Sequence, residues 1–212
     1  MNWLDKLERR GRKLAIPGLM KIVVIGMALV FVCNLLFPQA NLLYYLAFSP
    51  ALILQGQVWR VFTFVFLPPD SSLLFIVFAL YFYYLIGTSL ENAWGSFRFT
   101  LYYFIGMLGA IIAGFLTGSA TNSYLNLSLF FAFAAVYPDM QVLLFFLIPI
   151  KVKWLAIIDA VLFAVQLIFA DWATRAAVIA SLANFFIFFG PALFTRLKNY
   201  RRREDWRRQM RR

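Results

Sequence analysis

Residues 97–118 read FRFTLYYFIGMLGAIIAGFLTG, and this stretch decides the class of fold. Its one charged residue, Arg98, lies near the start, and every later position is apolar, aromatic, small or hydroxylated. A helix over this stretch is long enough to cross the roughly 30 Å hydrocarbon core of a bilayer. One side of it carries small residues at four-residue spacing, which predicts close packing of another helix, with a dimer interface as the alternative. These small residues are Gly106, Ala110, Gly114 and Gly118.

Similar apolar runs recur along the 212-residue chain, which is 63% hydrophobic and only 14% charged. Soluble domains are about half apolar and about a quarter charged. The runs predict an all-α membrane protein with six membrane-spanning helices between residues 20 and 194. The fourth is short, so we expect other helices to surround it. The predicted spans are Met20–Phe37, Ser71–Thr88, Phe97–Gly118, Tyr124–Tyr137, Lys153–Phe169 and Arg175–Phe194.

The segment between the first two predicted spans, residues 41–67, is hydrophobic and aromatic but is broken by Pro50 and Gly56. It is too apolar for water and too broken to cross a bilayer, so we expect a first loop embedded in the membrane interface. Trp59 suits the depth of the lipid headgroups. The guanidinium of Arg60 is expected either to meet lipid phosphate or to hold the loop together.

Basic residues are distributed unevenly between the two sides of the predicted bundle. Of the 20 Lys and Arg, only Arg60 and Arg175 fall on the side opposite the termini, which predicts cytoplasmic N- and C-termini. Residues 1–19 form a basic amphipathic segment expected at the membrane surface, and residues 195–212 form a basic cytoplasmic tail. The net charge of +11 therefore indicates membrane lipids as partners, and no nucleic acid is expected.

Histidine is absent from the chain, and Cys33 is the single cysteine. The absence of imidazole excludes every mechanism that needs a histidine base, and with it the usual zinc sites. One cysteine forms neither an intrachain disulfide nor a thiolate cluster. We therefore expect no cofactor and no metal.

Three stretches resemble motifs of the rhomboid and derlin superfamily. Residues 56–63 (GQVWRVFT) resemble the Trp-Arg motif of the first loop, and residues 87–99 (GTSLENAWGSFRF) resemble the turn after the second span. Residues 137–139 (YPD) and 146–150 (FLIPI) are similar to the connection between spans four and five. The resemblance runs in order from about residue 20 to residue 194. It implies a six-helix rhomboid-like bundle with a membrane-embedded first loop.

Active members of this superfamily use a serine in span four, a histidine in span six, and two oxyanion-stabilising side chains in span two. By resemblance, these positions hold Ser123, Asn184, Phe75 and Ala79. An asparagine amide has no basic lone pair, and neither Phe75 nor Ala79 has a side-chain hydrogen-bond donor. The resemblance therefore implies a catalytically inactive bacterial rhomboid-like pseudoprotease, not an enzyme.

Such a protein would lie in the plasma (inner) membrane, bind transmembrane client proteins or help to remodel or move them, and perturb local lipid packing. The alternative is an intramembrane serine protease with an unconventional or residual active site, which would use Ser123 or Ser128. Asp159 and Asn184 are polar groups at membrane depth and are candidates for a buried polar site. The identity of the clients and the formation of a homo-oligomer stay open.

Overall fold

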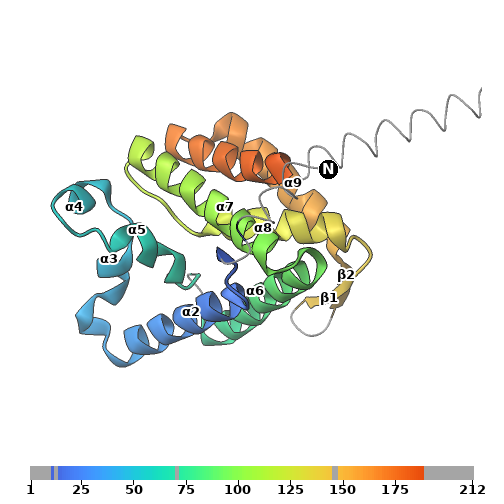
Figure 1. Cartoon of the computed structure of the whole chain (residues 1–212), viewed down its shortest axis with the longest axis horizontal. Helices are drawn as coiled ribbons and strands as arrows, with labels where there is room; N and C mark the ends of the chain where they lie inside the picture. Colours follow the sequence, from blue (N-terminus) through green and yellow to red (C-terminus); the bar gives the residue numbers. More distant parts are fainter. Residues whose placement is uncertain (1–10, 12–13, 70–71, 145–147, 189–212) are drawn as a thin grey trace, which may run out of the picture.

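The computed structural model describes residues 11, 14–69, 72–144 and 148–188, and helices dominate this part of the chain (Figure 1). Four of these helices are long: α2 (Leu19–Leu36), α6 (Leu73–Trp94), α7 (Ser96–Thr117) and α9 (Val152–Phe169). Two further apolar helices are shorter: α8 (Ser123–Val136) and the helix Trp172–Phe188. Five short elements lie between α2 and α6, the last four of them in the first loop: η2 (Pro38–Ala40), α3 (Leu42–Leu46), α4 (Pro50–Leu54), α5 (Arg60–Thr63) and η3 (Phe64–Phe66).

The four long helices have 18 to 22 residues and a mean hydropathy of 1.9 to 2.5, so each is long and apolar enough to cross a membrane. The prediction of an α-helical membrane protein is confirmed at this level. The fourth predicted span is the 14-residue α8, which is shorter than the roughly 20 residues that a simple crossing needs. The sixth predicted span is helical over Trp172–Phe188, and its predicted end at Phe194 lies outside the described residues. The prediction of six crossings is therefore not established by helix length.

Helix α6 continues beyond its predicted end at Thr88 as far as Trp94. The segment after Thr88 contains no helix breaker until Gly95, which takes a positive φ of 84°. The Gly95 N–H donates to the Glu91 carbonyl at 2.8 Å, and α7 begins at the next residue, Ser96. The α6–α7 turn thus consists of a single residue, and glycine is favoured there because a residue with a Cβ adopts this positive φ only at a cost.

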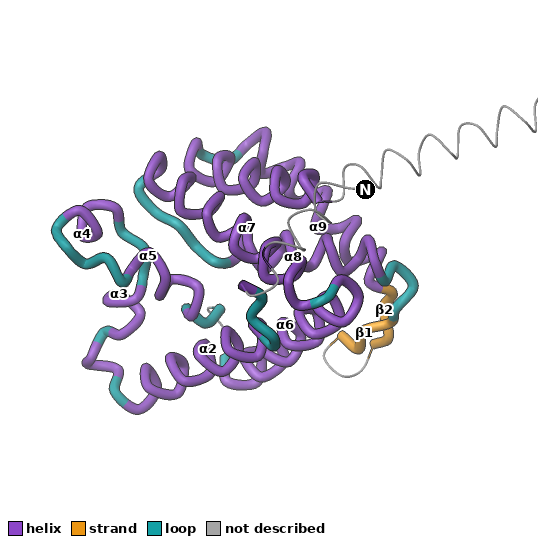
Figure 2. Tube along the Cα trace, in the orientation of Figure 1, coloured by secondary structure: helices purple, strands orange, loops and turns teal. Residues whose placement is uncertain are grey.

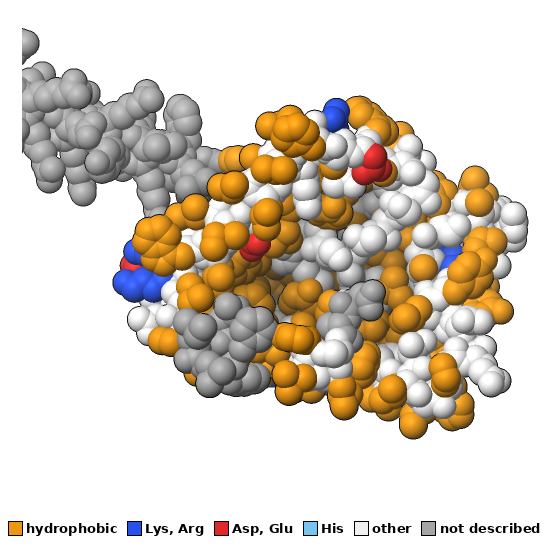
Figure 3. All heavy atoms as spheres, turned by 180° about the vertical axis from the view of Figure 1, so that it is seen from behind, with side chains coloured by type: hydrophobic (Ala, Val, Ile, Leu, Met, Phe, Trp, Pro, Cys, Tyr) orange, Lys and Arg blue, Asp and Glu red, His pale blue; other side chains and the backbone are white. Residues whose placement is uncertain are grey.

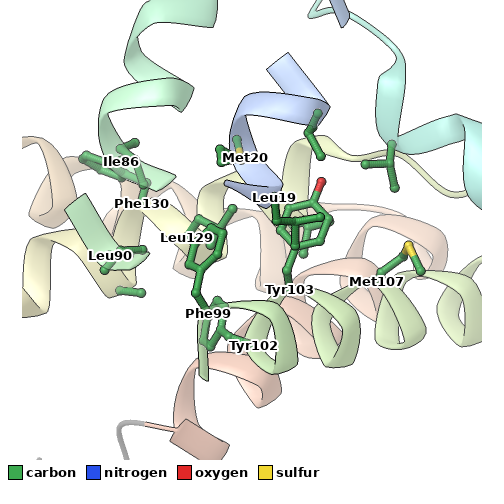
Figure 4. Packing of buried hydrophobic residues seen from close by; sticks show 14 of the residues in the cluster. Leu19, Met20, Ile86, Leu90, Phe99, Tyr102, Tyr103, Met107, Leu129 and Phe130 are labelled. Atoms are coloured by element: carbon green, nitrogen blue, oxygen red, sulfur yellow. The ribbon is translucent and has the colours of Figure 1, made fainter. Parts of the chain in front are cut away.

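The hydrophobic core lies where α2, α6, α7 and α8 meet (Figure 4). Leu90, Phe99 and Phe133 come from three different helices and are completely buried. Gly87 of α6 lies against Met20 of α2 so closely that a Cβ there would sit 2.2 Å from the Met20 Cγ. The contact between α2 and α6 therefore depends on the missing side chain at residue 87.

A two-stranded antiparallel hairpin joins α8 to α9 and was not predicted. Strand β1 (Gln141–Leu144) pairs with β2 (Ile148–Lys151), with Gln141 opposite Lys151. Pro149 lies in β2, which is possible because each strand of this pair has one free edge. Apolar runs of four residues do not distinguish a strand from a helix, so the all-α prediction missed this small element.

The hairpin is fixed to the ends of the helices by polar contacts. The Lys153 ammonium donates to an Asp139 carboxylate oxygen at 2.9 Å, and Lys151 lies 3.5 Å from the same oxygen. The hydrogen bond from Lys153, and the charges of both lysines, hold the pKa of Asp139 below its usual range. These three residues are exposed or half-buried, so their pairing contributes little to stability.

The first loop and the hairpin lie at opposite ends of the molecule. Helices α3, α4 and α5 are at the left of Figures 1 and 2, and β1 and β2 are at the right. The turn between α7 and α8 lies at the loop end, because the Asn122 amide reaches carbonyls of the first loop. The turn between α6 and α7 lies at the hairpin end, where the Tyr137 hydroxyl donates to the Ser89 carbonyl at 3.4 Å.

The outer faces of the long helices expose large hydrophobic side chains. Ile25 of α2, Leu116 of α7 and Val161 of α9 are each more than half exposed. Figure 3 shows hydrophobic side chains over much of one face, with few charged groups among them. A surface of this kind is compatible with lipid and not with water. The predicted amphipathic segment (1–19) lies largely outside the described residues, and the predicted tail (195–212) lies wholly outside them.

Candidate functional site

The first loop is organised around a buried arginine. Arg60 is 1% exposed, and its Nη1 donates to the carbonyls of Tyr44 at 2.5 Å and Ala47 at 2.7 Å. Its Nε donates to the Gln57 Oε1 at 2.7 Å, and its guanidinium lies 5.3 Å from the centre of the Tyr44 ring. The guanidinium therefore holds the loop together. The other expectation, a contact with lipid phosphate, does not fit this burial.

Trp59, the neighbour of Arg60, points the other way. Its side chain is 47% exposed, and its indole N–H donates to the Tyr45 carbonyl at 3.3 Å. Leu54, Val58 and Phe62 are exposed as well, so the surface of the loop is apolar around the indole ring. An apolar, aromatic surface supported by a buried cation is suited to the membrane interface.

Asn122 connects the first loop to α8, and sequence reasoning gave it no structural role. Its side chain is 6% exposed, and its Nδ2 donates to the carbonyls of Val65 at 3.0 Å and Leu67 at 2.7 Å. An asparagine directly before a helix suggests an N-cap, but this side chain makes no capping bond to α8. No local signal in the sequence points to partners more than fifty residues away.

Ser123, which stands at the family nucleophile position by resemblance, is exposed at the first turn of α8. Asn184, however, does not approach it. The Asn184 Nδ2 lies 3.4 Å from the Ser128 Oγ, and Ser128 is about 7.5 Å further along α8 than Ser123. The pairing of Ser123 with Asn184, expected from the resemblance, is therefore not present in this arrangement.

Ser128 belongs to a buried cluster with Tyr102 and Asn184. The Tyr102 hydroxyl is 2.6 Å from the Ser128 Oγ and donates to the Ser128 carbonyl at 3.0 Å. The Asn184 Nδ2 also lies 3.4 Å from the Tyr102 carbonyl. All three side chains are at most 2% exposed. The cluster joins α7, α8 and the helix Trp172–Phe188 by hydrogen bonds, and it contains no group that acts as a strong base at neutral pH.

The small residues of α7 serve different purposes. A Cβ at Gly106 would sit 2.5 Å from Leu125 and 2.7 Å from the Asn184 Nδ2. The absence of a side chain at Gly106 therefore allows Asn184 to pack directly against α7. A Cβ at Gly114 would sit 2.6 Å from Phe48 of the first loop. Ala110 packs half-buried against the core. Gly118 differs from the prediction, because it ends α7 with a φ of 91° and has no neighbour within 4 Å of its Cβ position.

A second polar region lies on the other side of α8. A cavity of about 330 Å³ is bounded by α6, α8 and α9, and Ser123, Asn126 and Asp159 contribute its polar groups together with Tyr83. Ala79, at one expected oxyanion position, also lines this cavity, whereas the exposed Phe75 is not among its lining residues. Phe78, Phe82, Leu127 and Phe130 supply most of the apolar wall.

Asp159 and Asn184 do not form one site, contrary to the prediction. Asp159 lines the cavity with Asn126, whereas Asn184 bonds to Ser128. Two residues along an α-helix turn by about 200°, so Asn126 and Ser128 lie on opposite faces of α8. The two predicted polar residues are therefore separated by the body of this helix.

The apolar helices, their exposed hydrophobic surface and their polar interior define a multi-pass integral membrane protein. A comparison with known protein families agrees with this class, since the family model described as "Eukaryotic integral membrane protein (DUF1751)" matches residues 21–123. This match covers α2, the first loop, α6 and α7 and stops at the first residue of α8. It is just under half of the chain. No curated protein matches the sequence.

Proposed function

We propose that this protein is a non-catalytic, rhomboid- and derlin-like membrane protein that binds transmembrane segments of other proteins and helps to remodel or move them. The observation that carries the proposal is the cavity between α6, α8 and α9. It is bounded by helices with lipid-compatible surfaces, and its wall is mainly apolar with a few polar groups. A site of this composition suits an apolar segment that enters from the bilayer.

The residues at the family catalytic positions support a function without proteolysis. Asn184 is engaged with Ser128 and Tyr102, and Ala79 and Phe75 offer no side-chain donor toward an oxyanion. Ser128, the other serine of the alternative proposal, is 1% exposed and is closed off by the Tyr102 hydroxyl. A serine hydroxyl is a weak nucleophile without an adjacent base, and this chain contains no histidine.

The first loop adds a second activity to the proposal, the perturbation of local lipid packing. The exposed side of the loop is apolar around Trp59, while Arg60 fixes its backbone from within. We place this loop in the outer leaflet of the plasma (inner) membrane, with six crossings and both termini in the cytoplasm. The positive-inside distribution of Lys and Arg supports this orientation.

Photo-crosslinking tests the proposal directly. A crosslinking amino acid replaces Phe78, which lines the cavity, or Ile112, which is 61% exposed on α7 and lies outside it. We expect transmembrane segments of other proteins, identified by mass spectrometry, to be captured at residue 78 and not at residue 112. Equal capture at both positions would show only random contacts within the bilayer and would reject the cavity as a client site.

Loop variants test the contribution of the first loop. Trp59→Ala and Arg60→Ala are expected to reduce capture at residue 78, because they remove the aromatic surface and the support of the loop. Trp154→Ala removes an indole from α9 that is 57% exposed, against 47% for Trp59, and is the matched control. If Trp59→Ala captures as much as the control, the loop has no part in client binding.

The protease alternative is tested by labelling the purified protein with a fluorophosphonate, which traps activated serines. We expect no adduct. A stoichiometric adduct on Ser123 or Ser128 would demonstrate an activating base and would replace the proposed function with proteolysis.

A further inference from the structure

We propose that the cavity between α6, α8 and α9 recognises a basic side chain, a lysine ammonium or an arginine guanidinium, carried within a transmembrane segment of a client. This inference rests on the proposed function and names the class of segment that the cavity takes. It assigns Asn126 and Asp159 as the groups that receive the cation. Both residues line the cavity, one from α8 and the other from α9.

Asn126 is a buried amide with an unused acceptor. Its side chain is 4% exposed, and its Oδ1 has no hydrogen-bond partner among the described residues. The amide also lies beside the Tyr83 phenol, a further lining group of the cavity. A buried amide oxygen without a partner is costly, and among the described residues with such an unpartnered buried atom, Asn126 is the one that lines this cavity. The cavity wall therefore offers a hydrogen-bond acceptor, the Asn126 Oδ1, to a ligand that carries a donor.

Asp159 adds the negative charge. Among the described residues it is the one charged group in the cavity lining, and it has neither an ion pair nor a hydrogen bond with any of them. Lys151 and Lys153, the basic residues at the start of α9, are paired instead with Asp139 at the hairpin. An unpaired carboxylate at membrane depth indicates a functional site with a partner of opposite charge.

The apolar part of the cavity lining restricts the kind of molecule to which the cationic group belongs. Phe78, Phe82 and Phe130 line the same cavity as the polar groups, so the body of the ligand is expected to be apolar. Asp159 lies seven residues after Val152 at the start of α9, which is roughly 10 Å along the helix axis. A lysine or arginine in the middle of a transmembrane helix reaches this depth, whereas the amine of a phospholipid headgroup is held at the membrane surface.

The recognition also fits the energetics of client segments. A basic residue in the middle of an apolar helix is unstable in lipid and is stabilised when it meets a carboxylate and a hydrogen-bond acceptor. Asp159 supplies the carboxylate, and Asn126 supplies the hydrogen-bond acceptor. Segments with such a residue would therefore be preferred over uniformly apolar ones, which gives the cavity a basis for selectivity.

The test uses the full-length protein reconstituted in phosphatidylcholine vesicles. The probes are two labelled leucine-alanine transmembrane peptides that differ at one position, where one has lysine and the other has leucine. Binding is followed by energy transfer from a label on the protein. We expect the lysine peptide to bind at least tenfold more tightly than the leucine peptide. Asp159→Asn and Asn126→Leu are each expected to abolish this preference, while Asp139→Asn, which changes an exposed carboxylate at the hairpin, retains it.

The possible results separate this inference from the proposed function. If both peptides bind equally, and Asp159→Asn changes neither, the inference is wrong while client binding stands. If neither peptide binds, both the inference and the proposed function fail. If phosphatidylethanolamine in the vesicles displaces the lysine peptide, the cation that the cavity takes is a lipid amine, which overturns the inference. Thermal midpoints of the variants near that of the wild type verify that a loss of binding is not a loss of fold.

Discussion

The two faces of α8 differ in how many hydrogen bonds their polar groups form with neighbouring helices. On one face, Ser128 is enclosed by Tyr102 and Asn184, with a 2.6 Å contact between hydroxyl oxygens. On the other face, Asn126 keeps an unpartnered oxygen beside a cavity that also receives Asp159. The helix is the same, and the residues are two positions apart. The difference lies in what the neighbouring helices bring to each face.

This contrast indicates different roles for the two faces. Hydrogen bonds between polar side chains of different helices stabilise one arrangement of those helices, and Ser128, Tyr102 and Asn184 are bonded in this way, although the Asn184 Oδ1 has no partner among the described residues. An ionisable group without a partner at membrane depth, such as Asp159, reduces stability and is a candidate for function. We therefore expect substitutions on the Ser128 face to lower stability, and substitutions on the Asn126 face to affect binding with little loss of stability or with a gain.

The largest effect is expected for Gly106→Ala. The new Cβ would lie 2.5 Å from the Leu125 Cδ1 and 2.7 Å from the Asn184 Nδ2, so both side chains would have to move and Asn184 would lose its contacts with Ser128 and Tyr102. Overpacking of this kind costs about 3 kcal/mol. The control is Gly109→Ala, whose Cβ meets Ala180 at an ordinary 3.7 Å. Thermal unfolding in detergent should show a lower midpoint for Gly106→Ala alone, and equal midpoints would disprove close packing at residue 106.

Tyr102→Phe should have the next largest effect. It removes the hydroxyl that contacts both oxygens of Ser128 and leaves these buried groups with fewer partners. The expected loss of stability is about 2 kcal/mol, measured by chemical or thermal unfolding of the purified protein. Tyr81→Phe removes the hydroxyl of a tyrosine that is 53% exposed on α6 and serves as the control. A loss no greater than that of the control would mean that the cluster is not a stabilising network.

Asp159→Leu is expected to change stability in the opposite direction. It removes a carboxylate that has no partner among the described residues and adds apolar volume beside the cavity. The expected gain is about 1 kcal/mol, because an ionisable group within a membrane helix is unfavourable. A lower thermal midpoint for this variant would show that Asp159 has a structural role, and the contrast between the two faces would no longer hold.

The smallest effect concerns pH and lies outside both faces, at the hairpin. The pKa of Asp139 is lowered by Lys153 and Lys151, so the stabilisation that it contributes is present above its usual pKa of about 4. The stabilisation is lost as pH falls through the lowered pKa, because the carboxyl is then protonated. The difference in thermal midpoint between wild type and Asp139→Asn should be small at pH 7 and should decrease as the pH is lowered below about 4. A difference that stays constant over this range would exclude the ion pair as its cause.

The sequence was sufficient to locate the helices. Each of the four long helices begins within two residues of its predicted start, because long apolar runs have few alternatives to a membrane helix. The sequence also predicted that the first loop is not one continuous helix, because Pro50 and Gly56 interrupt it. The hairpin was missed because its strands are only four residues long.

The candidate site was less accessible from the sequence. Whether Asn184 faces Ser123 or Ser128 depends on how far one helix is shifted along the other. Composition and residue spacing do not predict a shift of one helical turn. The sequence left open whether Arg60 meets lipid phosphate or holds the loop together, because its carbonyl partners, on Tyr44 and Ala47, are backbone groups without a sequence signature. The resemblance gave the positions, but contacts between helices decide which side chains meet.

The first helix has a consequence for the biosynthesis of the protein. The N–H of Gly18, just before α2, donates to the Glu91 carboxylate at 2.8 Å across 73 positions of sequence, and Glu91 also accepts from the Ser96 hydroxyl at 2.7 Å. At 5 to 20 residues per second, a ribosome needs roughly 4 to 15 s to add that stretch. During this interval α2 is in the membrane without its partner, and it depends on lipid or on the insertion machinery. The hydrogen bond that holds the start of α2 therefore forms only after the α6–α7 turn has been synthesised.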